Sequence, residues 1–389
     1  MREKNAPKLR FKGFFEDWEQ RKFNNLVVRV NKITNSNSLP KIEFEDILAG
    51  EGRLNKDVSQ KFDNRKGVEF LPNDILYGKL RPYLKNWLKP SFTGVALGDF
   101  WVFRVIKSDS DFIYSLIQSD KYQRVANDTS GTKMPRSDWK KVSETEFLVP
   151  DNRNEQQKIG NFFKQLDDTI ALHQRKIDSL KLLKHAFLQK MLVNQGFFPE
   201  VRFADFDEKW EQRKLGDLGT VAMNKRIFKK ETSERGDIPF YKIGTFGSVP
   251  DSFISRRLFD EYKEKYPYPE KGDLLISASG SIGRVVEYTG ADEYFQDSNI
   301  VWLKHDNQLV NSFLKQFYNI VKWHGLEGST IKRLYNKNIL ETEIGLPSRD
   351  EQQKIGYFFK QLDDTIALHQ NKLDNFKQLK KSFSQKIFI

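Results

Sequence analysis

The chain contains the same twenty-residue segment twice. Residues 155–174 read EQQKIGNFFKQLDDTIALHQ and residues 351–370 read EQQKIGYFFKQLDDTIALHQ, so nineteen of the twenty letters agree at an offset of 196. A second pair, PKLRFKGFFEDWEQRKF at 7–23 and PEVRFADFDEKWEQRKL at 199–215, repeats at an offset of 192. Solenoid repeats have a much shorter period. The sequence therefore predicts a duplicated unit, in which a variable region precedes each near-constant segment.

Each near-constant segment has the periodicity of a long helix. Apolar residues recur at alternating steps of four and three over 159–191 and 355–387, which is the heptad pattern of a coiled coil. Packing the two helices against each other would bury both stripes, and the alternative is that each helix packs on its own globular region. The central seam residues are expected to be Leu166, Ile170, His173 and Ile177 in the first copy and Leu362, Ile366, His369 and Leu373 in the second.

The start of each helix is marked by a proline, an N-cap residue and a capping-box glutamine. These are Pro150, Asn154 and Gln157 in the first copy, and Pro347, Asp350 and Gln353 in the second. Gly160 and Gly356 each cost about 1 kcal/mol of helix stability. Their presence in both copies indicates that either the other helix or a partner protein approaches the backbone closely there.

Four polar residues interrupt the apolar stripes, namely His173, Lys184, His369 and Lys380. Histidine can bind a metal or sense pH, but each helix offers one such residue with no second ligand a turn away. We therefore interpret His173 and His369 as polar seam residues that help to set the register. Lys184 and Lys380 are interpreted as lysines whose stems cover the seam while their ammonium groups reach solvent.

Length and composition limit what the variable regions do. A chain of 389 residues suggests two or three domains, and the absence of cysteine excludes disulfides and thiolate metal sites. The start of the chain lacks the apolar run of a signal peptide, and no stretch approaches the roughly 20 apolar residues of a membrane span. A cytoplasmic protein is therefore expected. Sixty-five Lys and Arg against fifty-three Asp and Glu give a formal charge of +12, which favours a polyanion such as nucleic acid.

The variable regions have α+β character. Strands are expected within 74–80, 98–106, 272–280 and 298–304, and helices within 111–126 and 309–325. Glycine-containing loops at matched places in the two copies carry basic and hydroxyl residues, which suit contacts with phosphates and base edges. The residues expected to contact DNA are Lys79, Arg81, Lys133 and Arg136 in the first region, and Lys242, Ser279, Ser281, Arg284, Lys332 and Arg333 in the second.

The combination of these motifs resembles the specificity subunit of type I restriction-modification systems. The resemblance lies in the paired EQQKIG...DDTIALHQ helices, the LVP and GLP segments before them, the GDLL turn with its SASGSIG loop, and the RF...WEQRK leads. It implies two target-recognition domains at 1–153 and 195–349, and two helical regions at 154–194 and 350–389 that form an antiparallel coiled coil with pseudo-twofold symmetry. The first domain departs from the family wording, with LYGKLRPYLKN where the second has LISASGSIGRV.

The resemblance also implies partners. Family members read a bipartite sequence in double-stranded DNA, one half-site per recognition domain, while the helices hold the domains apart and dock modification subunits, here expected to number two, and restriction subunits. S-adenosylmethionine would belong to the modification subunits, and ATP and Mg²⁺ to the restriction subunits. The chain itself is expected to be non-catalytic, without cofactor or metal. A closed pseudo-twofold would also place the end of the second helix, near Ile389, beside Pro7.

Two other classes of function are alternatives to DNA recognition. Pro250-Asp251 followed after nine residues by Glu261-Tyr262-Lys263 resembles the pattern of metal-dependent nucleases. The pattern is short and degenerate, and in a chain that is 30% charged a chance match is favoured. A coiled-coil scaffold whose globular regions bind proteins is the second alternative. Salt-sensitive DNA binding would separate DNA recognition from the scaffold.

Overall fold

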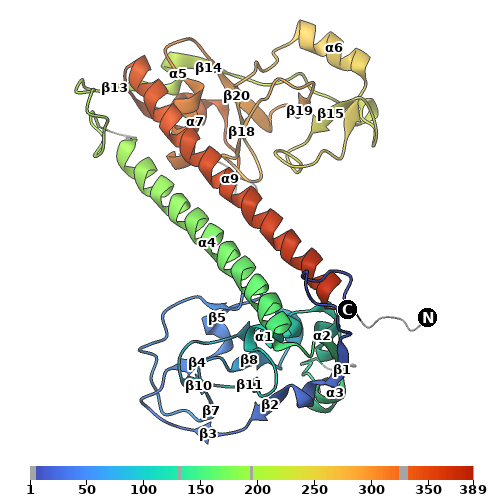
Figure 1. The fold of residues 1–389 in the computed structure, drawn as a ribbon. Coiled ribbons are helices and arrows are strands. Elements are labelled where there is room, and N and C mark those ends of the chain that lie inside the picture. Colours follow the sequence, from blue (N-terminus) through green and yellow to red (C-terminus); the bar gives the residue numbers. More distant parts are fainter. Residues whose placement is uncertain (1–5, 130–132, 193–195, 324–331, 389) are drawn as a thin grey trace. The chain divides into compact units, whose positions relative to one another are not determined.

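The structure, a computed structural model, describes residues 6–129, 133–192, 196–323 and 332–388. It divides into two compact units, one formed by Met1–Lys176 with His369–Ile389 and the other by Ile177–Leu368. The division passes through two long helices, α4 (Arg153–Met191) and α9 (Arg349–Ile387), so each unit combines one globular region with a part of both helices (Figure 1). Each helix has 39 residues and is therefore about 58 Å long.

In the globular region of the first unit, two four-stranded sheets have the orders β2-β11-β8-β9 and β3-β7-β10-β4, and all neighbours are antiparallel except β10 and β4. Two-stranded pairs β1-β12 and β5-β6 complete the strands. The elements are β1 (Glu19–Lys22), η1 (Phe23–Asn25), β2 (Val27–Val30), β3 (Ile33–Thr34), β4 (Lys41–Ile42), η2 (Phe44–Asp46), β5 (Ile47–Leu48), β6 (Arg53–Leu54), β7 (Gly67–Phe70), β8 (Ile75–Gly78), η3 (Pro82–Leu84), β9 (Trp87–Leu88), β10 (Gly94–Ala96), β11 (Phe100–Val105), α1 (Ser110–Ile117), α2 (Asp120–Ala126), α3 (Trp139–Glu144) and β12 (Glu146–Val149).

The second unit repeats this plan. Its sheets have the orders β14-β20-β17-β18 and β16-β15-β19, with β15 and β19 parallel, and β13 pairs with β21. The elements are β13 (Glu211–Lys214), α5 (Leu215–Leu218), β14 (Gly219–Ala222), η4 (Lys229–Glu231), β15 (Ile238–Tyr241), β16 (Phe253–Ile254), α6 (Arg256–Lys265), β17 (Leu274–Ser277), β18 (Val285–Glu287), β19 (Tyr294–Phe295), β20 (Ile300–His305), α7 (Asn311–Ile320), α8 (Asn336–Leu340) and β21 (Glu343–Leu346).

The expected strands and helices are largely confirmed. The four predicted strands are β8, β11, β17 and β20, which form the centres of the two equivalent sheets. The single helix expected over 111–126 is instead two helices, because Ser119 caps α2 with its hydroxyl and interrupts the backbone pattern. The helix expected over 309–325 is α7, and positions 324 and 325 lie outside the described residues.

The two long helices run antiparallel, as expected. Within the first unit Phe162 of α4 packs on Phe383 of α9 with ring centroids 5.0 Å apart, and within the second unit Phe187 packs on Phe358 at 5.2 Å. The two expected alternatives, packing of the helices on each other and packing on a globular region, therefore occur together. Their middles pack on each other, while their ends join the globular cores. Across the described residues, neither helix is long and apolar enough to cross a membrane, and no other helix is.

The helix starts differ from the predicted ones. Asn154 and Asp350 lie inside the first turns, and the side chains that cap them belong to Asn152, whose Oδ1 accepts from the amide of residue 154 at 2.9 Å, and Ser348. The capping boxes are wrong too, because the helices begin at Arg153 and Arg349, which makes Gln157 and Gln353 the fifth helical residues and not the third. The neighbouring glutamines are buried. The side-chain nitrogens of Gln156 and Gln352 donate to the carbonyls of Pro150 and Pro347, respectively. Their side-chain oxygens accept from the backbone amides of Asp109 and Val310, respectively.

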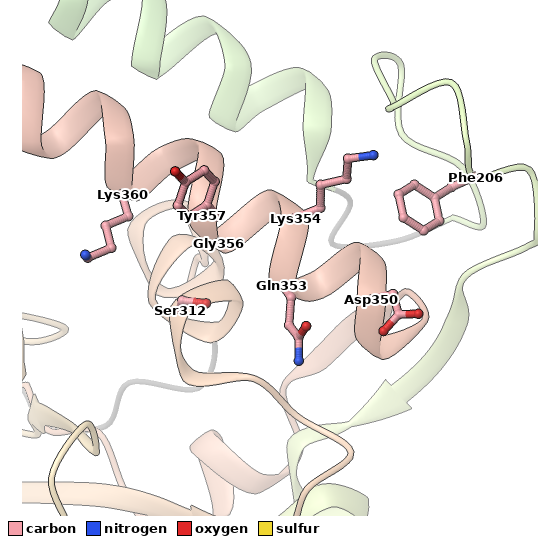
Figure 2. A pocket seen from close by; sticks show the side chains of 8 residues that line it. All are labelled: Phe206, Ser312, Asp350, Gln353, Lys354, Gly356, Tyr357 and Lys360. Carbon is pink, nitrogen blue, oxygen red and sulfur yellow. The ribbon is translucent and has the colours of Figure 1, made fainter.

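The nearest neighbour of each of the two helix glycines is a helix of a globular region and not the other long helix. A Cβ on Gly160 would lie 2.6 Å from the amide nitrogen of Phe112 in α1, and a Cβ on Gly356 would lie 2.1 Å from Ser312 Oγ in α7. Figure 2 shows Gly356 and Ser312 facing each other where α9 crosses the start of α7. The glycines therefore allow each long helix to lie directly on a helix of its own unit.

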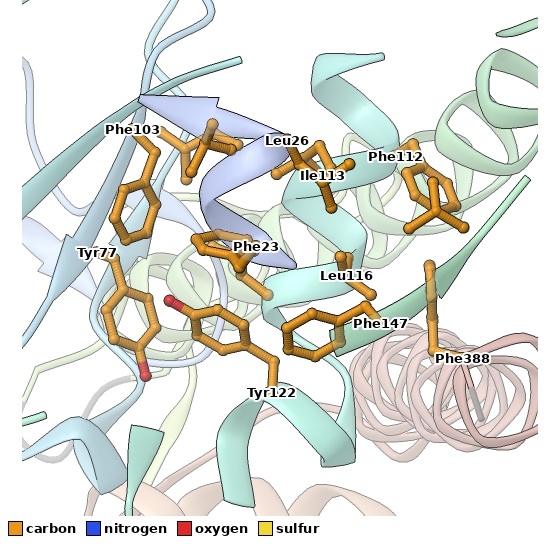
Figure 3. Close-up of a cluster of buried hydrophobic side chains, with 14 of the residues drawn as sticks. Phe23, Leu26, Tyr77, Phe103, Phe112, Ile113, Leu116, Tyr122, Phe147 and Phe388 are labelled. Carbon is orange, nitrogen blue, oxygen red and sulfur yellow. The ribbon is translucent and has the colours of Figure 1, made fainter. Parts of the chain in front are cut away.

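The core of the first unit is rich in aromatic residues and includes the end of α9. Phe23 lies at its centre, with ring centroids 5.3 Å from Phe103 and 5.2 Å from Tyr122, and Phe388 packs on Phe112 at 5.6 Å (Figure 3). Ile159 and Phe163 of α4 belong to the same cluster. Aromatic packing of this kind supplies much of the stability of a core.

The two ends of the chain are closed as the pseudo-twofold interpretation predicts. The amide of Leu9 donates to the carbonyl of Lys386 at 3.2 Å, and in the second unit the amide of Val201 donates to Lys190 at 3.0 Å. Ile389 itself lies outside the described residues. The segment before each recognition domain thus bonds to the end of a long helix in both units. The boundaries proposed between recognition domains and helical regions stay predictions.

Candidate nucleic-acid interface

In the first unit, backbone hydrogen bonds join the loop after β8 to two distant segments. The amide of Lys79 donates to the carbonyl of Asp99 at 2.9 Å, and the Lys79 carbonyl accepts from the amide of Ser137 at 2.8 Å. Leu80 and Arg136 form an isolated antiparallel bridge. The loop after β8, the turn before β11 and the segment before α3 therefore meet at one place.

The second unit builds the same junction from different residues. The amide of Ala278 donates to the carbonyl of Asn299 at 2.7 Å, and the Ala278 carbonyl accepts from Leu334 at 2.8 Å. Ser279 and Arg333 form the matching bridge. Position 99 therefore corresponds to position 299, and position 136 corresponds to position 333.

Both junctions contain left-handed backbone. Asp99 and Asn299 lie directly before the central strands β11 and β20, at what we call the strand entry. The residue before each of them is left-handed, namely Gly98 with φ +83° and Ser298 with φ +59°. Arg81 and Lys85, at φ +49° and +58°, flank η3 in the loop after β8. A left-handed conformation costs a non-glycine residue about 1–2 kcal/mol. Such strain clusters at functional sites, where the surrounding structure holds it in place.

In the first unit, one carboxylate gathers two of the predicted DNA-contacting cations. Arg136 Nη2 donates to Asp99 Oδ2 at 2.9 Å, and Lys79 Nζ lies 3.6 Å from Asp99 Oδ1. The Arg136 side chain is still 56% exposed. Its remaining N–H groups therefore face solvent. Arg81, also exposed, is tied into the site by its amide, which donates to the carbonyl of Pro135 at 2.7 Å.

In the second unit, the corresponding arginine has a different partner. Arg333 Nη2 donates to the backbone carbonyl of Ser298 at 2.8 Å. The side chain of Asn299, at the position of the aspartate, accepts from Ser279 Oγ at 2.8 Å through its Oδ1. Arg226 Nε pairs with Asp297 Oδ2 at 2.9 Å beside them.

These residues border a polar cavity of about 490 Å³, a size typical of ligand sites. Its lining is rich in cationic and amide side chains and includes Arg226, Lys229, Lys242, Gln296, Asp297, Ser298, Asn299 and Arg333. The lining holds four cationic side chains and one carboxylate, that of Asp297. That excess suits the phosphate groups of a nucleic acid, while the amides supply both donors and acceptors for base edges.

The other predicted residues lie nearby but outside this cluster. Lys133 and Lys332 are exposed, in the segments that lead to Arg136 and Arg333. Ser281 is exposed in the loop after β17. Arg284 is also exposed, and its Nη1 donates to the carbonyl of Phe246 at 2.7 Å. The charge pattern of the sequence did not select six residues of these sites: Asp99, Arg226, Lys229, Gln296, Asp297 and Asn299.

The residues of the nuclease pattern have unrelated partners. Asp251 pairs with Lys242 at 2.9 Å, Glu261 with Lys265 at 3.2 Å, and the amine of Lys263 with Asp292 at 3.3 Å. Within the part of the chain that the structure describes, no three His, Cys, Asp or Glu side chains are grouped as a metal site would require. The structure therefore does not support the nuclease alternative.

The type I restriction modification DNA specificity domain family matches the chain twice, over residues 16–182 and 207–378. The chain belongs to this family. Each match covers a recognition region together with most of the long helix that follows it. The duplicated unit found in the sequence is therefore a duplicated specificity domain.

Relatives and solved structures agree with this assignment. A Haemophilus influenzae protein named as a type I restriction enzyme specificity subunit is 55% identical over 155 residues, which is 40% of this chain and 40% of that protein. The match thus spans well under two thirds of that relative's length. The MjaVIII specificity subunit of Methanocaldococcus jannaschii is 22% identical over 299 residues, covering 71% of this chain and 68% of the relative.

The fold of this specificity protein is similar to that of the S subunit of the type I restriction-modification system from M. genitalium. That structure has a TM-score of 0.63 at 17% identity and covers 99% of both chains. A second chain, solved in work on complex assembly and conformational transition of the type I R-M system, has a TM-score of 0.54 at 18% identity. It covers 95% of this chain and 97% of its own. At such low identity the likeness concerns the fold alone.

Proposed function

We propose that this specificity protein reads a bipartite sequence in double-stranded DNA, with one half-site for each recognition domain. The observation that carries the proposal is the junction built twice, in which an arginine bridges to the loop after a central strand at Arg136 and again at Arg333. Two copies of one junction with different side chains suit two half-sites of different sequence, because base edges are distinguished by their donors and acceptors.

The partners form part of the same proposal. The two long helices are proposed to dock two modification subunits, which use S-adenosylmethionine, and the assembled complex to include restriction subunits that use ATP and Mg²⁺. The chain itself acts in the cytoplasm as the non-catalytic DNA-recognition subunit. The helices also act as a ruler, because both run through both units. Lengthening both by the same number of heptads is expected to change the spacer between the half-sites and to leave the half-sites unchanged.

Sequencing of methylated DNA tests this function directly. Cells that produce the chain with its modification partner are expected to carry methylation at one bipartite motif, and cells that lack the chain are not. Methylation without any sequence motif, or no dependence on the chain, would contradict the proposal.

Binding to DNA in solution gives a second test. The purified complex is expected to bind the motif with an affinity that falls steeply as salt rises, because bound cations release counterions from the phosphates. Lys332→Ala is expected to weaken binding to all sequences and to reduce the salt dependence. The matched control is Lys360→Ala on α9, whose side chain is 68% exposed and pairs with Asp364. Salt-independent binding would favour the protein-binding scaffold instead.

A further inference from the structure

We propose that position 99 in the first unit and position 299 in the second determine which base each recognition domain prefers. The proposal rests on the function proposed above. Both positions hold a short polar side chain at the entry to a central strand, and both are fixed by a backbone bond to the loop after the neighbouring strand, at 2.9 Å and 2.7 Å. Neither position was selected by the charge pattern of the sequence.

Both units have an arginine next to this position, Arg136 or Arg333, but the two guanidinium groups bond different partners. Arg136 donates to the carboxylate of Asp99 at 2.9 Å, whereas Arg333 donates to the carbonyl of Ser298 at 2.8 Å. The physical reason is the charge at the strand entry. A carboxylate attracts the guanidinium, while the neutral amide of Asn299 does not compete with the backbone carbonyl for it. Residue 99 or 299 therefore aims the arginine.

In the first unit this arrangement presents two cations side by side. Asp99 holds Arg136 through one carboxylate oxygen and lies 3.6 Å from Lys79 Nζ through the other. Their remaining donors suit an edge with two acceptors. Guanine offers two such acceptors, O6 and N7, in the major groove, and arginine and lysine are its usual partners. We expect the first half-site to contain a guanine read by this group.

In the second unit the arginine bonds a backbone carbonyl, and an amide stands at the position of the aspartate. Asn299 accepts from Ser279 Oγ at 2.8 Å through Oδ1, and Asn299 lines the polar cavity next to Ser298. That bond holds the amide, whose Nδ2 makes no other bond among the described residues. An asparagine amide pairs with the N6 and N7 edge of adenine. We expect the second half-site to contain an adenine at the corresponding position.

The backbone at both positions is suited to such an exchange of side chains. The preceding residue is left-handed in both units, as Gly98 and as Ser298, and the same two backbone bonds close each junction. Aspartate and asparagine have nearly the same shape. Asp99→Asn and Asn299→Asp therefore change the charge at the entry position while the fold around it is kept.

The experiment compares methylated motifs from cells that contain the complete complex with wild-type chain, with Asp99→Asn or with Asn299→Asp. Asp99→Asn is expected to lower the preference for guanine in the first half-site by about 10-fold or more, and to leave the second half-site unchanged. Asn299→Asp is expected to change the second half-site only. The control is Asp151→Asn, which removes another aspartate that pairs with an arginine, Arg21, in the first unit. This control is expected to leave both half-sites unchanged.

Three outcomes overturn the inference. The first is an unchanged motif in both variants. The second is a change at the wrong half-site. The third, from gel shifts with the purified complex, is an equal loss of binding to every base in both variants, which identifies the two residues as purely structural. Each of these leaves the proposed function intact. Absence of any bipartite motif with the wild-type chain would instead contradict the proposed function.

Discussion

The ammonium group of Lys184 lies 2.6 Å from a carboxylate oxygen of Asp363, and the same ion pair recurs between Lys380 and Asp167 at 2.5 Å. The interpretation of the two lysines as reaching solvent is therefore wrong, because each is held by an aspartate of the other helix. Since the two helices are copies, parallel pairing would place lysine opposite lysine and aspartate opposite aspartate. The repeated charges thus favour the antiparallel direction.

Removal of one lysine tests this pairing. Burial raises the pKa of Asp167, while the charge of Lys380 opposes that rise. Lys380→Met leaves the carboxylate without its counter-charge, so the free energy of unfolding at pH 7 is expected to fall by about 1–3 kcal/mol. Because a raised carboxyl pKa favours the protonated folded state, the loss is smallest at low pH and develops as the pH rises through the pKa of Asp167.

Urea denaturation at several pH values provides the measurement. The double variant Lys380→Met/Asp167→Leu is expected to recover most of the lost stability, since an apolar pair replaces the ion pair. Lys360→Met, at an exposed pair on the same helix, is the control and is expected to change stability by less than about 0.5 kcal/mol. Equal losses for both lysines would show that the pair between the helices has no special role.

Acid is expected to weaken the contact between the helices at the histidine pair. His173 Nδ1 lies 2.9 Å from His369 Nδ1, so at most one of these two nitrogens carries a proton. Burial, followed by the charges of His369 and Lys372, lowers the pKa of His173. A lowered histidine pKa gives stability that is present above the ordinary value and is lost as the pH falls through the lowered one.

The measurement is the thermal midpoint between pH 8 and pH 5. His173→Leu/His369→Leu is expected to show a smaller decrease on acidification than the wild type, because apolar residues replace the histidine pair in the seam. His185→Leu, at an exposed position of the same helix, serves as the control. An identical pH dependence in wild type and double variant would show that other groups cause the acid sensitivity.

A buried glutamate at each helix start holds the segment that leads into each recognition domain. Glu351 accepts from Arg202 at 2.7 and 2.8 Å and from Trp210 Nε1 at 3.1 Å, and it is only 1% exposed. Glu351→Ala leaves the charge of Arg202 without a partner, so the free energy of unfolding is expected to fall by about 3–5 kcal/mol. Glu211→Ala, at an exposed glutamate in the same unit, is expected to change stability little. Chemical denaturation measures both, and similar effects would contradict the importance of this contact.

The helix glycines are expected to resist replacement by alanine, although alanine favours helix by about 1 kcal/mol. At Gly356 the added Cβ would meet the side chain of Ser312 at 2.1 Å, so Gly356→Ala is expected to destabilise the fold by about 1–3 kcal/mol. Gly356→Ala/Ser312→Gly should restore part of the loss, because the colliding side chain is gone. A stabilised single variant in thermal unfolding would show that α7 moves aside at no cost.

The two twenty-residue copies differ at one position. Asn161 of the first copy corresponds to Tyr357 of the second, which is 64% exposed and lines a surface cavity of about 660 Å³ beside Phe206 and Lys354 (Figure 2). The other positions are shared because they make the same contacts twice. Glu155, for example, binds Arg10 at 2.6 and 2.8 Å and Trp18 at 3.4 Å, which matches the contacts of Glu351 in the other unit.

The sequence by itself determined the features that depend on local periodicity and on repetition. Heptads specify long helices, alternating apolar runs specify β8, β11, β17 and β20, and the repeated leads specify two equivalent units. Arg10 and Glu155, which form the buried glutamate contact of the first unit, both lie in segments that the sequence repeats. Their pairing was not visible in the sequence, because residues 10 and 155 are brought together only by the packing of the first unit.

Only the tertiary structure decided how the candidate site is assembled. Lys79, Asp99 and Arg136 come from three separate segments, and they meet because β8 and β11 are neighbours and a bridge returns the chain to the same edge. A charge pattern selects exposed cations, but it does not show which anion orients them. The direction of Arg136 and of Arg333 depends on the strand-entry residue, and strand order, which is a non-local property, places that residue beside the arginine.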